Sequence, residues 1–355
     1  MIHAHSRCTA RDQHQGDGCC FILPPHILKQ IVERGSDKQR SRALESIASA
    51  GHIRGARAIR AAIAMAIPAG EKRRTIYDAK QQTTLPGKLV RGEGAKRSRD
   101  VAVNEAYDGS GTVYDFYDKA FSRNSIDGKG LRLDSSVHYD RQYDNAFWDG
   151  QQMVYGDGDG EIFNRFTISL DVIGHELTHG VTQYEAGLVY DGQPGALNES
   201  MSDVFGSLVK QWSKKQTAAK ADWIIGEGLL AKGVNGVGLR SMKAPGTAYD
   251  DKVLGKDPQP AHMKDYYKGT ADNGGVHINS GIPNYAFYLV AQALGGNAWE
   301  RAGKIWYTAL CDWLKPQSTF ADARTATVGA AADLYGKSSK EAKAVAAAWK
   351  KVGVT

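Results

Sequence analysis

The spacing of apolar side chains changes along the chain and divides it into three parts. Near the N-terminus, apolar residues between Ile22 and Glu33 recur at helical spacing after the stiff pair Pro24-Pro25, which predicts a short amphipathic helix. From Arg74 to about Arg165, short runs rich in Tyr, Val, Phe and Thr are separated by turn signals such as Asp108-Gly109, which predicts a β-rich region. After Thr167 the apolar period lengthens to that of helices.

Six helices are expected in the second half of the chain, and two of them begin with the spacing of a capping box. Thr319 is followed three residues later by Asp322, and Ser338 is followed in the same way by Glu341. The expected helices span Asp171–Tyr184, Leu197–Trp212, Pro283–Leu294, Ala298–Leu314, Thr319–Tyr335 and Lys340–Val352.

Charge is concentrated at the start of the chain. The 355 residues are 42% hydrophobic and 24% charged, which is enough for a substantial core and excludes disordered and fibrous proteins. Residues 1–74 contain 13 Lys/Arg and 6 Asp/Glu, which gives them a net charge of +7. The whole chain has a formal net charge of +6, so residues 75–355 are close to neutral. A basic leader on a neutral body indicates two parts with separate functions, joined by a plausible linker over residues 34–74.

The positions of the cysteines and the lengths of the apolar runs exclude further classes of protein. Three of the four cysteines, Cys8, Cys19 and Cys20, lie in the leader, and Cys311 stands alone in an apolar stretch, so no disulfide framework holds the body together. The first twenty residues contain no apolar run of signal-peptide length, and no leader segment is long enough to span a bilayer.

The pentapeptide His175-Glu176-Leu177-Thr178-His179 has the form H-E-x-x-H. On a helix, residues four apart share a face, so both imidazoles can face one metal ion while the glutamate faces the water beside it. Such a pattern arises by chance in about one chain in a hundred, so two helix-surface histidines are the alternative interpretation at this point.

A second helical segment offers the ligands that this motif lacks. Catalytic zinc takes three protein ligands, commonly two His and one Glu, and Glu199 supplies the missing carboxylate. Asp203 lies four residues later on the same helix face, where it can accept the remaining N–H of a ligating histidine. The two segments together predict a zinc site with a supporting carboxylate.

The order and spacing of these motifs resemble the gluzincins of the thermolysin type over roughly residues 74–355. The first of the further motifs that agree are Asn145-Ala146-Phe147-Trp148, Met153-Val154-Tyr155-Gly156-Asp157-Gly158 and Ala186-Gly187-Leu188-Val189-Tyr190. The others are Leu239-Arg240-Ser241-Met242 and the run from Asp272 to Gly281, which contains His277.

The resemblance implies an α+β, two-lobed fold preceded by a short propeptide. Residues 1–70 are then the propeptide with its linker, and residues 71–183 a β-rich N-terminal lobe that ends with the active-site helix between the lobes. Residues 184–355 form a mainly α-helical C-terminal lobe.

The resemblance also implies the catalytic groups. His175, His179 and Glu199 would bind one Zn²⁺, and Glu176 would act as the general base on the attacking water. The remaining catalytic and supporting residues would be His277 and Tyr190, which stabilise developing negative charge, Asp272, which orients His277, and Asn198 and Asp203 around the metal. From the residues alone, a packing role for Tyr190 and a turn role for Asp272 stay open.

Substrate contacts follow from the same resemblance. Asn145 and the backbone of Ala146 would bind the substrate main chain, and Arg240 would reach a substrate carbonyl past the scissile bond, although a surface ion pair is its alternative role. The residues that align with a hydrophobic S1′ pocket are Phe163, Phe166, Val172 and Leu239. The resemblance therefore implies cleavage before Leu, Phe, Ile or Val.

Calcium requires a separate argument, because many thermolysin-type enzymes hold a calcium pair near the active-site helix. Asp171, Asp222 and Glu227 match that carboxylate cluster, but Lys210 and Ile224 occupy two of its acidic positions. A cation beside a lysine in a site short of two carboxylates is electrostatically unfavourable, so we expect no calcium pair. The acidic run of residues 156–161 lacks EF-hand spacing and is interpreted as a hairpin turn.

The leader resembles the short propeptides of the protealysin-like branch, which carry a Pro-Pro-Leu-type motif. Here the motif is Pro24-Pro25-His26, and its third position departs from the pattern. A diproline lacks N–H groups and is stiff, which suits a segment that occupies a protease cleft. Cys20 could place a thiolate on the zinc ion, or it could be a packing cysteine.

The leading hypothesis is a secreted zinc metalloendopeptidase, monomeric and latent until its inhibitory propeptide is removed, with peptides or proteins as substrates and neither nucleic acid nor membrane as partner. The second hypothesis is a protein that binds nucleic acid or an anionic surface through its basic leader. The leader lacks the interleaved aromatic residues of a nucleic-acid-binding surface. The third is an inactive binding protein on a protease scaffold. Export without a recognisable signal peptide and a cytoplasmic location are both compatible with the leader.

Overall fold

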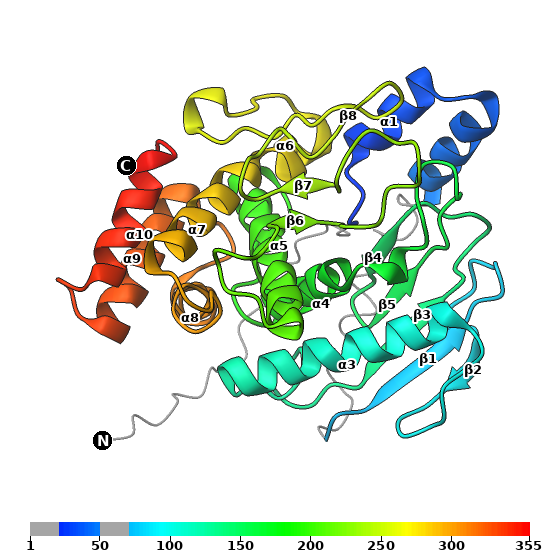
Figure 1. Cartoon of the computed structure of the whole chain (residues 1–355), viewed down its shortest axis with the longest axis horizontal. Coiled ribbons are helices and arrows are strands. Elements are labelled where there is room, and N and C mark those ends of the chain that lie inside the picture. The colour runs from blue at the N-terminus through cyan, green and yellow to red at the C-terminus, as the bar shows by residue number, and fades with distance from the viewer. Residues whose placement is uncertain (1–20, 50–70) are drawn as a thin grey trace.

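The computed structural model describes residues 21–49 and 71–355, and Figure 1 shows a mixed sheet on one side of the molecule and a group of helices on the other. Helices α4 (Leu170–Tyr184) and α5 (Gly192–Lys214) run between these two parts. Both helices are almost entirely buried, because each is covered on opposite faces by the two lobes.

The sheet of the N-terminal part has five strands in the order β2-β1-β3-β5-β4. The pairs β1–β3 and β3–β5 are parallel, with Ile76 opposite Ser135 and Ser135 opposite Met153, whereas β2 and β4 pair antiparallel at the edges. The strands are β1 (Arg74–Asp78), β2 (Lys88–Arg91), β3 (Leu133–Val137), β4 (Ala146–Trp148) and β5 (Gln152–Tyr155).

A long helix, α3 (Val101–Phe121), lies across this sheet, and the sequence pattern did not predict it (Figure 1). The expected turn at Asp108-Gly109 is wrong, because both residues lie inside α3. Gly109 is there for packing: a Cβ on it would lie 2.4 Å from Cδ1 of Ile173 on α4. The Asp100 carboxylate caps the helix by accepting from the backbone N–H of Ala102 at 2.9 Å.

The C-terminal part is helical, as expected, with several boundaries shifted. Helix α5 begins at Gly192, five residues before the predicted start. The expected helix Ala298–Leu314 is instead a short helix α8 followed by one turn of π-helix. The remaining helical elements are η1 (Phe166–Ile168), η2 (Met263–Asp265), α6 (Ala271–Asn279), α7 (Gly281–Leu294), α8 (Ala302–Thr308), η3 (Ala309–Trp313), α9 (Phe320–Tyr335) and α10 (Lys340–Lys351). Short strand pairs join them: β6 (Ile224–Ile225) with β7 (Arg240–Ser241), and β8 (Asp250–Asp251) with β9 (Gly255–Lys256).

The helix starts test the two predicted capping boxes. Thr319 and Asp322 form the complete reciprocal box at the start of α9, which confirms that prediction. The box predicted at Ser338 is wrong, because the cap is Ser339, whose hydroxyl accepts from the N–H of Ala342 at 3.1 Å. A one-residue shift moves the cap without changing the helix, since adjacent serines offer the same chemistry.

The acidic run of residues 156–161 is a loop and not a hairpin turn. The chain leaves β5 at Tyr155, and the Asp159 carboxylate then accepts from the backbone N–H groups of Glu161 and Ile162 at 2.9 and 2.7 Å. An Asp-centred turn satisfies these donors locally, so no returning strand is needed.

Among the described residues, no helix is both long and apolar enough to cross a membrane.

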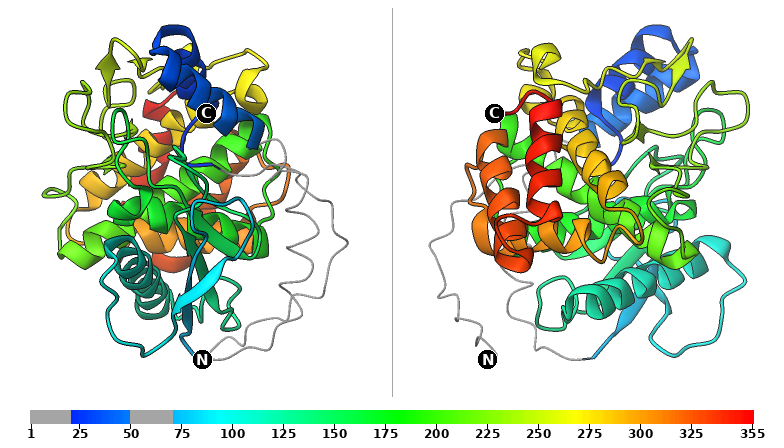
Figure 2. Two further views of the ribbon diagram at one scale, coloured as in Figure 1. Left: turned by 90° about the vertical axis from the view of Figure 1, so that its right-hand side faces the viewer. Right: turned by 60° about the vertical axis from the view of Figure 1, so that its left-hand side comes forward.

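Residues 21–49, called the N-terminal segment below, pack onto the two-lobed body. Helix α1 (Pro25–Arg34) confirms the predicted short helix, although it begins at Pro25 and not after the diproline, and it buries Ile27, Leu28 and Ile31 against the main core. Residues 37–49 form a second helix. Both views of Figure 2 place these two helices at the end of the molecule opposite β1 and β2.

Candidate functional site

The chemistry-bearing side chains meet where α4 crosses α5. The two helices approach closely because Gly206 on α5 faces the backbone of α4: a Cβ at that position would lie 2.4 Å from the carbonyl oxygen of Asp171. This close approach brings Glu199 of α5 to the pair His175 and His179, which share one face of α4.

Three side chains with ligand atoms converge in a buried pocket. The Nε2 atoms of His175 and His179 lie 2.9 Å apart, and the Glu199 carboxylate oxygens lie 3.5 and 3.4 Å from them. All three side chains are fully buried. Ligand atoms of His175, Glu176 and His179 also lie within 4.8 Å of one another, so the glutamate of the motif borders the same pocket.

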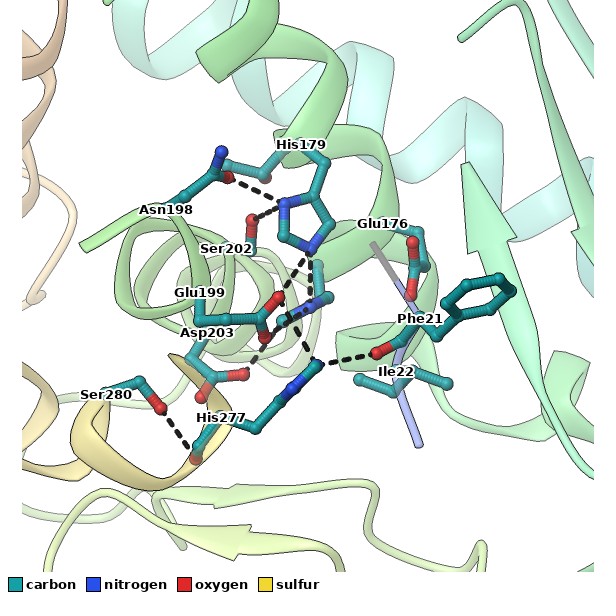
Figure 3. Close-up of polar contacts among 12 residues, drawn as sticks. Phe21, Ile22, Glu176, His179, Asn198, Glu199, Ser202, Asp203, His277 and Ser280 are labelled. Atoms are coloured by element: carbon teal, nitrogen blue, oxygen red, sulfur yellow. Dashed lines mark hydrogen bonds and ion pairs between the residues drawn. The ribbon is translucent and has the colours of Figure 1, made fainter. Parts of the chain in front are cut away.

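The hydrogen bonds of the two Nδ1 atoms, in His175 and His179, show that the Nε2 atoms face the pocket as acceptors. Nδ1 of His175 donates to Oδ1 of Asp203 at 2.8 Å, and Nδ1 of His179 donates to Oδ1 of Asn198 at 2.8 Å (Figure 3). Both Nε2 atoms therefore present lone pairs to each other and to a carboxylate. A cation relieves this repulsion, and two imidazoles with one carboxylate are the ligand set of catalytic zinc, so the residues present fit zinc.

Asp203 joins several parts of the site. Besides His175, its carboxylate accepts from Nε and Nη2 of Arg240, both at 2.8 Å, and from Nδ2 of Asn284 at 2.8 Å. Burial would raise the pKa of Asp203, but the Arg240 guanidinium and His175 outweigh it and hold that pKa well below its usual range. The buried carboxylate is thus kept ionised and fixes the orientation of one proposed zinc ligand.

His277 and Tyr190 border the same pocket from other elements. The Tyr190 hydroxyl donates to Glu199 and lies 3.1 Å from Nε2 of His277. Nδ1 of His277 lies 2.7 Å from Oδ1 of Asp272, and its backbone N–H donates to the second oxygen at 2.9 Å. Burial would lower the pKa of His277, but the carboxylates of Asp272 and Glu199 outweigh it and raise that pKa to about 9.

Backbone conformation brings Asp272 to His277. Residues 272–275 all have φ between 48° and 78°, so the chain turns back before the helical residues that carry His277. The glycines at the end of this run adopt that region without strain, which matches the Asp-Asn-Gly-Gly composition. Asp272 therefore lies in a turn, and its carboxylate also contacts His277.

The N-terminal segment lies in the cleft against the predicted substrate-binding groups. Ile22 donates its N–H to the Ala146 carbonyl at 3.2 Å, and Leu23 donates its N–H to Oδ1 of Asn145 at 3.0 Å. Nη1 of Arg240 donates to the Ile22 carbonyl at 3.2 Å. Arg240 is almost fully buried, so the structure excludes the alternative of a surface ion pair.

The Phe21 carbonyl points to the catalytic end of the cleft. It lies 3.0 Å from Nε2 of His277. Figure 3 marks this contact with a dashed line. A cavity of about 280 Å³ remains beside this part of the segment. Its lining comes from the segment and from the body and includes Phe21, Leu23 and Leu28 on one side and Asn145, Tyr190 and His277 on the other.

The predicted S1′ residues are all buried. Phe163, Phe166, Val172 and Leu239 belong to the same continuous core as Ile22. The apolar side chain of the segment thus enters the hydrophobic part of the body, next to the main-chain contacts described above.

Several contacting residues escaped the sequence interpretation. Ser202 places its hydroxyl 3.0 Å from Nδ1 of His179, and the backbone N–H of Trp148 donates to Oε2 of Glu176 at 3.0 Å. Ser202 could have been found from its position three residues after Glu199, on the same helix face. Asn284 and the contacts of Phe21 carry no local sequence signal, since tertiary packing brings them there.

Lys210 occupies the centre of the cluster that was compared with a calcium site. Its ammonium lies 2.7 Å from Oδ2 of Asp171 and 2.8 Å from Oδ1 of Asp222, and it donates to the Ile224 carbonyl at 2.6 Å. Burial would lower the pKa of Lys210, but the two carboxylates outweigh it and raise that pKa. Glu227 lies further away, at 3.8 Å.

His26, the residue that departs from the Pro-Pro-Leu-type motif, contacts the body. Nε2 of His26 lies 3.0 Å from the Tyr249 hydroxyl of the body.

The three leader cysteines, Cys8, Cys19 and Cys20, lie outside the described residues, and so does the thiolate proposed for Cys20. Cys311 is partly buried, and burial raises the pKa of its thiol to about 12, so it is an inert packing residue.

Family domains account for most of the chain. The thermolysin metallopeptidase catalytic domain matches residues 68–183, and the thermolysin metallopeptidase alpha-helical domain matches residues 186–354. The chain is 57% identical over 299 residues to an extracellular metalloprotease of Pectobacterium carotovorum subsp. carotovorum, covering 84% of this chain and 86% of that protein. It is 49% identical over 350 residues to protease PrtS of Photorhabdus sp., covering 96% of this chain and 94% of that protein.

A solved structure agrees with the sequence relatives. The precursor of protealysin, a metalloproteinase from Serratia proteamaculans, superposes with a TM-score of 0.87 at 58% identity, covering 95% of this chain and 100% of that one. This confirms the expected two-lobed α+β fold. The chain therefore belongs to the thermolysin family of zinc metallopeptidases, in its protealysin-like branch.

Proposed function

We propose that the chain is a zinc metalloendopeptidase, made as a precursor, that hydrolyses peptide bonds on the N-terminal side of hydrophobic residues. The observation that carries this proposal is the convergence of His175, His179 and Glu199 in one buried pocket that Glu176 borders. We assign residues 1–70 to the propeptide and linker, 71–183 to the N-terminal catalytic lobe and 184–355 to the C-terminal lobe.

His175, His179 and Glu199 would hold one zinc ion per chain. Zinc bound there supplies a Lewis acid, which lowers the pKa of water and polarises a peptide carbonyl. Asp203 and Asn198 fix the tautomers of the two histidines, so that both Nε2 atoms are available as ligands.

Glu176 is the general base. The backbone N–H of Trp148 holds one oxygen of its carboxylate, which orients the side chain toward the pocket. Glu176 takes a proton from the attacking water and returns it to the amine of the departing product.

His277 and Tyr190 stabilise the negative charge that develops on the carbonyl oxygen of the substrate. Asp272 holds Nδ1 of His277, which leaves Nε2 directed into the cleft as a donor. Because Asp272 already holds the His277 ring in place, little reorganisation of this donor is needed during the reaction.

Substrate binding uses main-chain contacts together with one apolar pocket. Asn145 and Ala146 bind the extended main chain, and Arg240 binds a carbonyl after the scissile bond. The pocket formed by Phe163, Phe166, Val172 and Leu239 accepts the side chain that follows the scissile bond. Its buried, apolar character supports cleavage before hydrophobic residues.

The N-terminal segment would act as an intramolecular inhibitor, because it occupies the same main-chain contacts as a substrate. Removal of this segment would then activate the enzyme. We further propose a monomeric, secreted enzyme, which needs neither nucleic acid nor membrane as a partner. The extracellular relative from Pectobacterium supports this location.

We also propose that the calcium pair of many relatives is absent. The Lys210 ammonium supplies the positive charge that the carboxylates of Asp171 and Asp222 require. A divalent cation beside this ammonium would be repelled.

The test combines metal analysis with peptide hydrolysis by the processed enzyme. Zinc should bind in equimolar amount, and a mixture of peptides should be cut before Leu, Ile, Val or Phe. Glu176→Ala should retain zinc and lose at least about a hundredfold in hydrolysis rate, the order expected for a general base. Glu300→Ala, at an exposed position, is the matched control. Zinc-independent hydrolysis, or full activity of Glu176→Ala, would contradict the assignment.

A further inference from the structure

The N-terminal segment lies in the cleft in a defined register. The Phe21 carbonyl faces His277, the group proposed to bind the developing oxyanion, at 3.0 Å. On the other side of the next peptide bond, Ile22 and Leu23 are held by three main-chain contacts with Ala146, Arg240 and Asn145. The bond between Phe21 and Ile22 therefore lies between the catalytic groups and the product-binding groups.

We propose that the Phe21–Ile22 peptide bond is a self-cleavage site of the precursor, hydrolysed by the active site of the same chain. This proposal rests on the proposed function. It identifies a peptide bond of the same chain as a substrate of that function. Ile22 is fully buried in the core that contains the proposed S1′ residues, so an apolar side chain follows the bond, as the expected specificity requires.

The chemistry is ordinary hydrolysis. Water adds to the carbonyl carbon of Phe21, the carbon–nitrogen bond to Ile22 breaks, and one proton from the water passes through Glu176 to the departing nitrogen. The products are a carboxylate at Phe21 and an amino group at Ile22, and no other reactant is needed.

Residues 22–49 stay bound after the cut, because they have anchors of their own that follow the cleaved bond. Ile27, Leu28 and Ile31 of α1 are buried against the body. Arg42 pairs with Asp159 at 3.5 Å, with both side chains buried, and Lys38 pairs with Glu161. The cut precursor is therefore a product complex that is still inhibited, and cleavage at this bond precedes activation.

The direct test is intact mass spectrometry of the zinc-loaded full chain under denaturing conditions. We expect a fragment that begins at Ile22, formed with a rate constant that is the same over a tenfold range of protein concentration, as an intramolecular reaction requires. Glu176→Ala should give no such fragment. A chain that hydrolyses an added peptide before Leu yet stays intact between Phe21 and Ile22 overturns the inference alone, and a chain that cuts neither overturns the proposed function as well.

Three variants test whether the position of Ile22 in the cleft controls the cut, as opposed to a general disturbance of the segment. Ile22→Asp should slow the cut by at least about tenfold, because a hydrophobic pocket discriminates by this order. Leu44→Asp, at a side chain that is 51% exposed in the same segment, should leave the rate unchanged. Ile22→Leu should keep the cut at the same bond. Equal rates for all three variants would overturn the proposed register.

A measurement without catalysis tests the same contacts. In metal-free Glu176→Ala precursor, the amide hydrogens of Ile22 and Leu23 donate to acceptors of the body, so hydrogen exchange there should be at least about a hundredfold slower than in an unfolded peptide. Exchange at the unfolded rate would show that the N-terminal segment does not occupy this register and would overturn the proposal.

Discussion

At the scale of single residues, Asp203 links metal binding to substrate binding. The same carboxylate holds Nδ1 of His175 and two nitrogens of Arg240. The helical spacing to Glu199 was enough to predict the first contact from the sequence. The contact with Arg240 could not be predicted, because the arginine comes from β7, 37 residues later, and only the folded chain places it there.

Asp203→Asn keeps the size of the side chain and removes its charge. We expect zinc affinity, measured by competition with a chelator, to fall about 10- to 100-fold, because the amide is a weaker acceptor for His175. Binding of substrate-like peptides should weaken too, since Arg240 loses its ion pair. Asp333→Asn, at an exposed position in α9, is the control. Unchanged zinc affinity would show that Asp203 does not support the metal site.

His26 should make the latency of the precursor pH-dependent. Its contact with Tyr249 is partly buried, and burial lowers the pKa of His26 from 6.5 to about 4 in the docked state, although Asp272 acts in the opposite direction and His277 and Arg240 add to the lowering. The docked state therefore favours neutral His26. Docking is fully stable above pH 6.5 and weakens as the pH falls toward 4.

Hydrogen exchange of α1 in the Glu176→Ala precursor, followed from pH 7 to pH 5 and corrected for intrinsic exchange, measures this effect. Protection should fall toward acid pH in the parent chain. In His26→Gln, which keeps a polar contact with Tyr249 and cannot titrate, protection should change less. An identical pH profile in both proteins would exclude His26 as the titrating group.

At the scale of elements, the active site depends on how closely α3, α4 and α5 pack. The helical periods of α4 and α7 were visible in the sequence, because their buried faces are lined by apolar side chains. Helix α3 was not, because glycine and serine occupy three consecutive buried positions in its middle, Gly109, Ser110 and Gly111. Small residues that permit close helix contact resemble turn residues in a sequence, and only packing distinguishes them.

Gly206→Ala tests this packing beside the metal site. The new Cβ would meet the Asp171 carbonyl oxygen at 2.4 Å and the backbone nitrogen of His175 at 2.9 Å, so α4 and α5 must separate. We expect a loss of about 1–3 kcal/mol in the free energy of unfolding and weaker zinc binding. Gly92→Ala, where a Cβ has no neighbour within 4 Å, should leave both unchanged.

The cluster around Lys210 predicts how the C-terminal lobe responds to chelation. Because an ammonium group already neutralises Asp171 and Asp222, a calcium-selective chelator should not change the unfolding temperature. Lys210→Met leaves the buried Asp171 carboxylate without its counter-charge and should cost about 3–5 kcal/mol. A sharp drop in the unfolding temperature of the parent chain on adding EGTA would contradict the absence of the calcium pair.

At the scale of the whole molecule, charge separates inhibitor from enzyme. Residues 1–74 carry a net charge of +7 and residues 75–355 a net charge of −1. The basic segment meets acidic groups of the body, since Arg42 pairs with Asp159 and Lys38 with Glu161. The sequence could predict the division between leader and body from composition. It could not predict the register of Phe21 in the cleft, which depends on contacts across more than a hundred residues.

The isoelectric point should therefore fall when the leader is removed. The full chain has a sequence isoelectric point of about 8.9, and an enzyme that begins near residue 75 carries a slight negative charge at neutral pH. Isoelectric focusing should show the Glu176→Ala precursor as a basic band and the processed enzyme as a band near or below neutrality. The precursor should also bind a cation exchanger in a salt-dependent way that the processed enzyme lacks, because these are exposed charges screened by salt. A processed enzyme that still focuses as a strongly basic species would show that the positive charge belongs to the catalytic body.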